Sequence, residues 1–143
     1  MSVLFKIFCY FGFLFSTACG GGHKTLDYGK TTRSDLLAQR GEPIKEESIL
    51  IDKGSILIYP ENHKFQLKND IVTHGFKDPV EDEKNLIYWK HKFKNCLTTT
   101  KKISGPLSHE LPEYELKCAS MGISVIFREE SEFITRIIEF EKE

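Results

Sequence analysis

The chain has no marked excess of charge of either sign, and its early apolar stretch is too short to span a membrane. Lys and Arg number 20 and Asp and Glu number 21, so the net charge is −1. A chain with this balance has no broad basic surface to hold nucleic acid. The apolar stretch from Ile7 to Phe15 is well below the ~20 residues that a spanning helix needs. The sequence therefore excludes nucleic-acid binding and a permanent membrane helix at this position.

Catalytic motifs are also missing. Gly29-Lys30-Thr31 resembles the end of a phosphate-binding loop, but Lys24 stands where that loop requires an earlier glycine. His109-Glu110 begins like a zinc-protease motif, but Glu113 replaces its second histidine and Pro112 would break its helix. No G-x-S-x-G motif occurs. We therefore predict a protein that is not an enzyme and that uses no metal ion or cofactor.

The first 22 residues have the pattern of an export signal. Lys6 supplies the positive charge, Ile7 to Phe15 form the apolar region, and Ser16-Thr17-Ala18 are the small residues of a cleavage zone. We expect residues 1–18 to be a signal peptide that is cut before Cys19. This segment resembles the signal of bacterial lipoproteins, although Ser16 stands where that family usually has leucine. The resemblance implies that Cys19 is acylated, whereas an ordinary signal peptidase would cut the same bond and leave it unmodified.

The number of cysteines helps to choose between these alternatives. Cys9 leaves with the signal, so an unmodified Cys19 would remain as an odd third thiol beside Cys96 and Cys118. If Cys19 is the lipid attachment site, Cys96 and Cys118 remain as a pair that can form a disulfide, contributing roughly 3 kcal/mol on the chain-entropy model. These two cysteines with His91 and His109 could also be imagined as a zinc site, but their spacing fits no closed site.

The remaining chain divides into a short tether and one domain. Residues 19–25, with three consecutive glycines, lack the apolar content to fold and should lift the domain off the lipid. Residues 26–143 are long enough for one domain with a single core. The protein would then be anchored on the periplasmic side of the outer membrane, or on the outer face of the cell membrane if only one membrane exists. Gly20 after Cys19 is compatible with outer-membrane sorting, by resemblance to enterobacterial lipoproteins.

One short helix is expected at the start of this domain. Thr32 can cap it, Asp35 stands three residues later as a weak capping-box partner, and Leu36 and Leu37 form its apolar edge. Gly41 and Pro43 end it. Because a helix of this length is unstable alone, its leucines must pack on another element.

The rest of the domain is predicted to be an antiparallel sheet of hairpins, which gives an α+β fold. Thr98 to Pro112 lacks periodicity and is expected to be a loop. The expected strands are Ser48–Ile51, Ser55–Tyr59, His63–Leu67, Ile71–Phe76, Leu86–Phe93, Tyr114–Cys118, Ile123–Phe127 and Phe133–Phe140.

A faint internal similarity raises the possibility of two similar halves. Gly41-x-Pro43 followed by Ile71-Val72-Thr73 parallels Gly105-Pro106 followed by Ile134-Thr135. Any two hairpins with aliphatic strands would align about as well, so we favour a chance match.

The residues from Gly29 to Pro43, with strands after them, resemble the opening of SmpA/OmlA-type envelope lipoproteins. Their G-x-T, D-L and G-x-P motifs match Gly29 to Thr31, Asp35-Leu36 and Gly41 to Pro43, and the resemblance covers residues 26–76. It implies an outer-membrane lipoprotein that maintains the envelope through contacts with another envelope protein, as the accessory lipoprotein of the β-barrel assembly machine does. The alternative is an exported inhibitor or small-ligand-binding protein directed at a hydrolytic enzyme.

Overall fold

The computed structural model describes residues 25–50, 54–103, 112–128 and 130–143, which form two α-helices and eight β-strands. Single 3-10 turns lie at Pro60–Asn62, Glu81–Lys84 and Ala119–Met121. The fold is therefore α+β, with the sheet as its larger part. In chain order the elements are α1 (Arg33–Arg40), β1 (Lys45–Ile49), β2 (Gly54–Ile58), β3 (Lys64–Lys68), β4 (Ile71–Lys77), α2 (Leu86–Lys92), β5 (Thr98–Ile103), β6 (Glu113–Cys118), β7 (Ile123–Arg128) and β8 (Phe133–Phe140).

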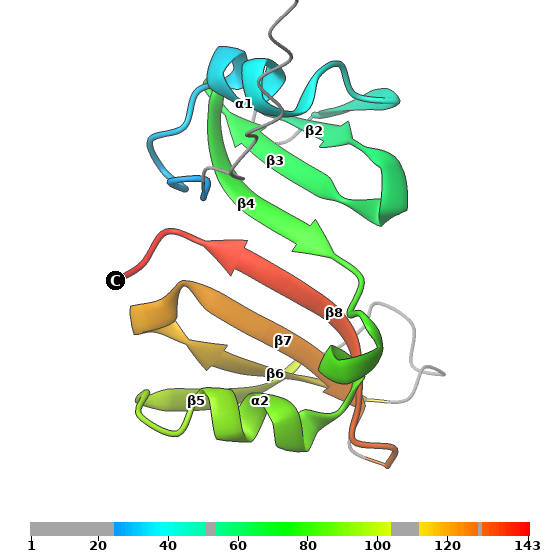
Figure 1. Cartoon of the computed structure of the whole chain (residues 1–143), viewed down its shortest axis with the longest axis vertical. Helices are drawn as coiled ribbons and strands as arrows, with labels where there is room; N and C mark the ends of the chain where they lie inside the picture. The colour runs from blue at the N-terminus through cyan, green and yellow to red at the C-terminus, as the bar shows by residue number, and fades with distance from the viewer. Residues whose placement is uncertain (1–24, 51–53, 104–111, 129) are drawn as a thin grey trace, which may run out of the picture.

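The strands form one antiparallel sheet with the order β1-β2-β3-β4-β8-β7-β6-β5. Strands β1 to β4 form one meander and β5 to β8 form another, because strands that follow one another in the chain pair in the sheet. The last strands of the two meanders, β4 and β8, pair in the middle (Figure 1). The edges of the sheet are consequently β1 and β5, the first strand of each meander.

The two halves of the sheet are built in the same way, each with a helix followed by four strands. In both halves the residue that caps the helix also forms an isolated bridge with the first residue of the last strand. Thr32 caps α1 and bridges to Ile71, whereas Asn85 caps α2 and bridges to Phe133. The strand part of the faint similarity in the sequence, Ile71 to Thr73 with Ile134-Thr135, therefore falls in the last strands of two units of one architecture. The glycine and proline part does not correspond, because Gly41 to Pro43 precede β1 whereas Gly105-Pro106 follow β5 and lie outside the described residues.

The backbone hydrogen bonds that hold each helix to its meander are also equivalent. The Arg33 N–H donates to the Asp70 carbonyl at 2.8 Å, and the Leu86 N–H donates to the Glu132 carbonyl at 3.1 Å. Asp70 and Glu132 both have positive φ values, of 61° and 50°, in the turn before the last strand. Each helix is thus fixed at its first residue to the same point of its own half.

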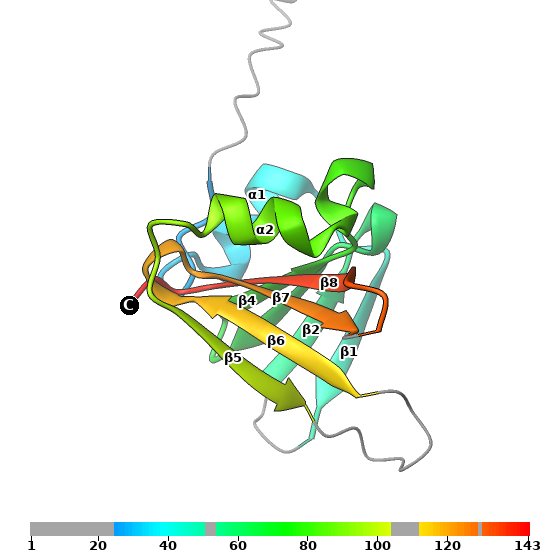
Figure 2. The ribbon, with the colours of Figure 1, turned by 90° about the horizontal axis from the view of Figure 1, so that it is seen from below.

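Both helices lie on one face of the sheet (Figure 2). Their buried side chains form two separate cores, one in each half, instead of the single core expected from the length of the chain. Full burial of such a side chain contributes about 1.5–3 kcal/mol. The first core contains Tyr28, Leu36, Leu57, Tyr59, Phe65, Leu67 and Val72. The second contains Leu86, Trp89, Phe93, Leu116, Cys118, Val125, Phe127, Ile134 and Ile137.

Polar residues join the two cores on this face. The Tyr28 hydroxyl donates to Glu139 Oε2 at 2.6 Å, and it lies so close to Gly75 that a Cβ at residue 75 would collide with it. Lys77 Nζ lies 3.7 Å from Glu139 and 3.8 Å from Glu83. Burial, followed by the charge of Glu139, raises the pKa of the Tyr28 phenol well above its usual value. The junction between the halves is therefore a hydrogen-bonded cluster beside the β4 to β8 pair.

The expected helix near residue 33 is confirmed, including its capping box. Thr32 Oγ1 accepts from the Asp35 N–H at 3.2 Å, and Asp35 Oδ2 accepts from the Thr32 N–H at 3.1 Å. The hydrogen bonds from Thr32 lower the pKa of the Asp35 carboxyl. Leu36 is fully buried on the sheet, as the sequence predicts for the apolar side of this helix.

The prediction of a strand over Leu86–Phe93 is wrong, because Leu86–Lys92 is the helix α2. The alternation that suggested a strand placed Ile87 and Trp89 on one face. In the structure Trp89 is fully buried while Ile87 is 63% exposed. Leu86, Trp89 and Phe93 have the spacing of one helix face, and the Asn85 side chain caps the Ile87 N–H at 2.8 Å.

The prediction of a loop from Thr98 to Pro112 is wrong for its first part, since Thr98–Ile103 is the edge strand β5. All but the last of its residues are exposed, so no apolar alternation marks it. The predicted strand Ser48–Ile51 overlaps β1 only at Ser48 and Ile49, and Ile51 lies outside the described residues. The other predicted strands correspond to β2, β3, β4, β6, β7 and β8 with shifts of at most one residue at either end.

Cys19 and the expected signal peptide lie outside the described residues. Within the part of the chain that the structure describes, neither helix is long and apolar enough to cross a bilayer.

Candidate functional site

The sheet face opposite α1 and α2, here named the open face, carries no helix among the described residues (Figure 2). Its side chains follow from the strand register, because alternate residues point to opposite faces. They are Lys45, Glu47, Ile49, Ile56, Ile58, Lys64, Gln66, Lys68, Ile71, His74, Phe76, Thr99, Lys101, Ile103, Glu113, Glu115, Lys117, Ser124, Ile126, Arg128, Phe133, Arg136, Ile138 and Phe140.

Apolar side chains gather on the open face where the two halves meet. Phe76 of β4 pairs with Ile138 of β8, and His74 pairs with Phe140 on the same two strands. The rings of His74 and Phe76 stack with their centroids 6.2 Å apart. The middle of the open face is therefore formed by both meanders together.

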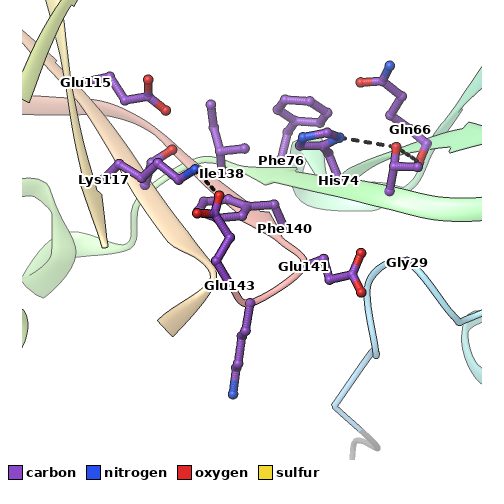
Figure 3. Close-up of a pocket in the computed structure, with 13 residues that line it drawn as sticks. Gly29, Gln66, His74, Phe76, Glu115, Lys117, Ile138, Phe140, Glu141 and Glu143 are labelled. Carbon is purple, nitrogen blue, oxygen red and sulfur yellow. Dashed lines mark hydrogen bonds and ion pairs between the residues drawn. The ribbon is translucent and has the colours of Figure 1, made fainter. Parts of the chain in front are cut away.

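The open face is hollowed beside this apolar centre. The hollow has a volume of about 680 Å³, and Figure 3 shows His74, Phe76, Ile138 and Phe140 on its walls with Lys117 at its rim. A second hollow of about 330 Å³ shares Phe76 with the first. A surface of this kind can take an inserted side chain or loop of another molecule.

Two residues of β7 lie buried on the open face although no helix covers it. Ser124 is fully buried and Ile126 is 3% exposed. Ser124 pairs with Lys117 on one side and with Ile138 on the other, so a small side chain lies between two long ones. Ser124 is among the residues that line the first hollow, and its buried hydroxyl has no hydrogen-bond partner among the described residues. Leaving a buried hydroxyl unpaired costs about 1–3 kcal/mol.

Lys117 is held at the rim by two contacts. Its Nζ lies 2.7 Å from Glu143 Oε1 and 4.6 Å from the centroid of the Phe140 ring. The Lys117 side chain is 33% exposed and that of Glu143 is 68% exposed. The ammonium group is therefore partly desolvated by a ring, while the carboxylate that pairs with it stands largely in solvent.

The surroundings of His74 favour the neutral form of its imidazole, because they lower its pKa. Burial is the larger cause and the charge of Lys117 the smaller cause of a pKa below the usual histidine value of 6.5. His74 Nδ1 lies 3.1 Å from Thr73 Oγ1, which itself donates to the Gln66 carbonyl at 3.2 Å. The ring is thus fixed by stacking on Phe76 and by this short chain of hydrogen bonds.

Basic side chains outnumber acidic ones on the open face, although the whole chain has a net charge of −1. Some of these charges are paired, for example Lys45 with Glu47 at 2.7 Å. Lys64, Lys68, Lys101 and Arg136 form no ion pair within 4 Å among the described residues. The basic residues are Lys45, Lys64, Lys68, Lys101, Lys117, Arg128 and Arg136, and the acidic ones are Glu47, Glu113 and Glu115.

The described residues contain no cluster of three or more His, Cys, Asp and Glu side chains that could hold a metal ion. Cys96 and Cys118 are instead joined by a disulfide with a Cα separation of 5.9 Å, as expected from the sequence. This bond ties the segment after α2 to the end of β6, in the core of the second half. His91 is exposed, and His109 lies outside the described residues.

No residue of the open face was singled out from the sequence as a site residue. Ser124, Lys117, Phe140 and His74 come together only through the pairing of β4 with β8 and of β6 with β7. Lys117 and Ser124 are joined by the hairpin of β6 and β7, whereas the pairing of β4 with β8 depends on the register of distant strands, which no local pattern encodes.

No known protein family matches the chain, and no curated protein or solved structure is significantly similar to it.

Proposed function

We propose that the protein is a lipid-anchored extracytoplasmic protein that binds another envelope protein through its open face and carries out no chemistry of its own. The observation that supports this proposal most directly is the open face itself. It is a wide sheet surface without a covering helix among the described residues, with an apolar centre at Phe76, Ile138 and Phe140 and with charged residues around it. Protein interfaces commonly have this arrangement of apolar centre and polar rim.

The sign of the surrounding charge indicates the kind of partner. Because basic residues are in excess on the open face, a partner with an acidic surface would be attracted and oriented by it. Among the described residues, the Ser124 hydroxyl has no hydrogen-bond partner, and the Thr73 hydroxyl that contacts His74 Nδ1 donates its proton to the Gln66 carbonyl. A binding role therefore uses more of the observed features than a catalytic role does.

The anchor rests on the sequence of the first 25 residues. In this proposal Cys19 is acylated, residues 19–25 form the tether, and the domain stands on the periplasmic side of the outer membrane. The resemblance of residues 26–76 to SmpA/OmlA lipoproteins agrees with this location and stays a prediction.

Site-specific photo-crosslinking in living cells tests the proposed interface. A photoreactive phenylalanine derivative at Arg136, an exposed residue of β8 on the open face, should give one discrete adduct with an envelope protein. The same group at Ile87, which is 63% exposed on α2, is the matched control and should give none. Adducts from position 87 alone, or none from either position, would contradict the proposal.

A second candidate function is inhibition of an exported hydrolytic enzyme. The hollow of about 680 Å³ favours this candidate, because it is large enough to accept a loop from the rim of an active site. The two candidates differ in the partner, which would be a soluble hydrolase. Binding to at least one of a panel of cell-wall hydrolases and β-lactamases, with loss of that enzyme's activity, would favour inhibition.

A further inference from the structure

We propose that Lys117 and Ser124 form a binding site for one acidic side chain of the partner, and that Glu143 occupies this site until the partner displaces it. This inference rests on the proposed function, because it assigns the chemistry of the partner at the open face. Three observations support it independently.

The first observation is the unpaired hydroxyl of Ser124. The side chain is fully buried, lines the hollow of the open face and has no hydrogen-bond partner among the described residues. Buried polar groups in folded proteins nearly always have partners, and the hydrogen-bonding capacity of this hydroxyl is unused among the described residues. A carboxylate oxygen that entered the hollow would accept a hydrogen bond from it.

The second observation is the position of Lys117. It is the direct cross-strand neighbour of Ser124, and both side chains line the same hollow. Its ammonium group stands over the Phe140 ring, which removes water from one side of the charge. An ammonium group that is partly desolvated in this way binds a carboxylate more strongly than a fully solvated one does.

The third observation is that a carboxylate already binds there. Glu143 Oε1 lies 2.7 Å from Lys117 Nζ, and Figure 3 shows this side chain reaching Lys117 beside Phe140. The side chain of Glu143 is 68% exposed, and exposed ion pairs typically contribute only about 0.2–1 kcal/mol. Glu143 can therefore be replaced at little cost by an acidic side chain that also reaches the Ser124 hydroxyl.

The walls of the hollow define the rest of the ligand. Phe76, Ile138 and Phe140 offer apolar contacts on either side of the charged group. An Asp or Glu side chain flanked by aromatic or aliphatic residues fits this surface, whereas a free small carboxylate would leave the walls uncovered. The site is accordingly assigned to an acidic residue within an apolar loop of a partner protein.

A titration with a defined peptide tests the site. The probe is an acetylated and amidated Gly-Phe-Glu-Phe-Gly peptide, added to the full chain in detergent and followed by the amide resonances of Lys117, Ser124 and Phe140. The matched peptide has Gln in place of Glu. We expect the Glu peptide to shift these resonances with saturation and the Gln peptide and free acetate to bind at least about tenfold more weakly. Equal binding of the Gln peptide or of acetate would overturn the assignment.

Variants of the chain separate this site from general electrostatic attraction. Glu143→Gln should tighten binding of the Glu peptide by about two- to fivefold, because the competing ion pair is lost. A gain of this kind cannot arise from misfolding. Lys117→Gln should abolish saturation, whereas Lys101→Gln, which removes an open-face charge outside the hollow, should leave the affinity within about twofold. Unchanged affinity in Glu143→Gln would overturn the proposal.

Ser124→Ala gives a second readout that a purely structural serine would not give. The substitution removes an unpaired buried hydroxyl, so the midpoint of thermal unfolding should stay equal or rise while binding of the Glu peptide weakens. A fall in both quantities would assign Ser124 to packing alone and overturn its role here. If crosslinks from Arg136 form while all these peptide results fail, the proposed function stands and only the acidic-residue site is wrong.

Discussion

Thr73 and Thr135 occupy equivalent positions in the two halves of the sheet. Each is the extra residue of a bulge in the last strand of its meander, since Gln66 pairs with His74 and Ile126 pairs with Arg136 across the shift in register. The Thr73 hydroxyl donates to the Gln66 carbonyl at 3.2 Å, and the Thr135 hydroxyl donates to the Ile126 carbonyl at 3.3 Å. Because a bulge bends its strand and increases the local twist, the two threonines shape β4 and β8 in the same way.

Replacing either threonine by valine should destabilise the protein by about 0.5–1.5 kcal/mol, since the β-branched shape is kept and one hydrogen bond is lost. The two substitutions have no shared partner and should add in the double variant. Urea unfolding of Thr73→Val and Thr135→Val measures both effects.

Thr99→Val is the control for these variants, because Thr99 is an exposed strand residue without a side-chain hydrogen bond among the described residues. It should change the free energy of unfolding by less than about 0.5 kcal/mol. A stability loss as large as that of the bulge variants would contradict the role assigned to the bulges.

The sequence predicts most of the strands because their own residues alternate between the core and the open face. In β3, for example, Phe65 and Leu67 are buried in the first core while Lys64 and Lys68 are exposed. The first helix is equally predictable, since Thr32 and Asp35 form a local capping box that needs no other part of the chain.

The segment that became α2 could not be assigned in the same way. Leu86 to Phe93 contains apolar and polar residues that satisfy a period of two as well as a helical period. Tertiary contacts select the helix over the strand for this segment. Trp89 is buried in the second core, and its Nε1 donates to the Glu83 carbonyl at 2.7 Å. The candidate site was also not predicted from the sequence, since Lys117 and Ser124 lie side by side only when β6 pairs with β7.

The cluster of Tyr28, Glu139 and Lys77 that joins the two cores on the helix face leaves room only for glycine at residue 75. A Cβ there would collide with the Tyr28 hydroxyl, which is held by Glu139. Gly75→Ala should therefore destabilise the protein by about 1–3 kcal/mol, as expected for overpacking of a filled site. Thermal or urea unfolding measures this loss.

A double variant shows whether the collision with Tyr28 is the cause. Tyr28→Phe removes the hydroxyl that would collide, so Gly75→Ala should cost less in the Tyr28→Phe background than in the natural chain. The coupling between the two substitutions should be about 0.5–3 kcal/mol. Additive effects would show that Gly75 is required for some other reason.

The disulfide should stabilise the second half of the sheet. Cys96 and Cys118 are separated by 22 residues in the chain, and a bond that closes such a loop contributes about 2–4 kcal/mol. Reduction, or the variant Cys96→Ser with Cys118→Ser, should lower the unfolding midpoint by a corresponding amount. Amide exchange should rise more in β5 and β6 than in β2 and β3, and a uniform rise would contradict this localisation.

The stability of the fold should depend on pH through His74. Its pKa is lower in the folded protein than the usual value of 6.5, so the unfolded chain binds the proton more readily. Stability is therefore full above about pH 7 and falls as the pH decreases through 6.5 toward the lower folded pKa. Urea unfolding at pH 7.5 and pH 5.5 should show this loss.

His74→Gln removes the titrating group and is the test of this assignment. Its free energy of unfolding should vary less between pH 7.5 and pH 5.5 than that of the natural chain. An unchanged difference between the two pH values would show that other groups are responsible.

Acylation of Cys19 is a prediction from the sequence that mass spectrometry can decide. The mature protein, extracted in detergent, should begin at Cys19 and carry the mass of several fatty acyl chains, because a single chain binds a membrane only weakly and reversibly. Cys19→Ala should lose this mass and leave the membrane fraction. Cys9→Ala is the matched control and should give an unchanged mature protein, since residue 9 leaves with the signal peptide. A precursor of full length in the cytosol with free thiols at Cys96 and Cys118 would contradict the anchor and the disulfide together, because export is the condition for both.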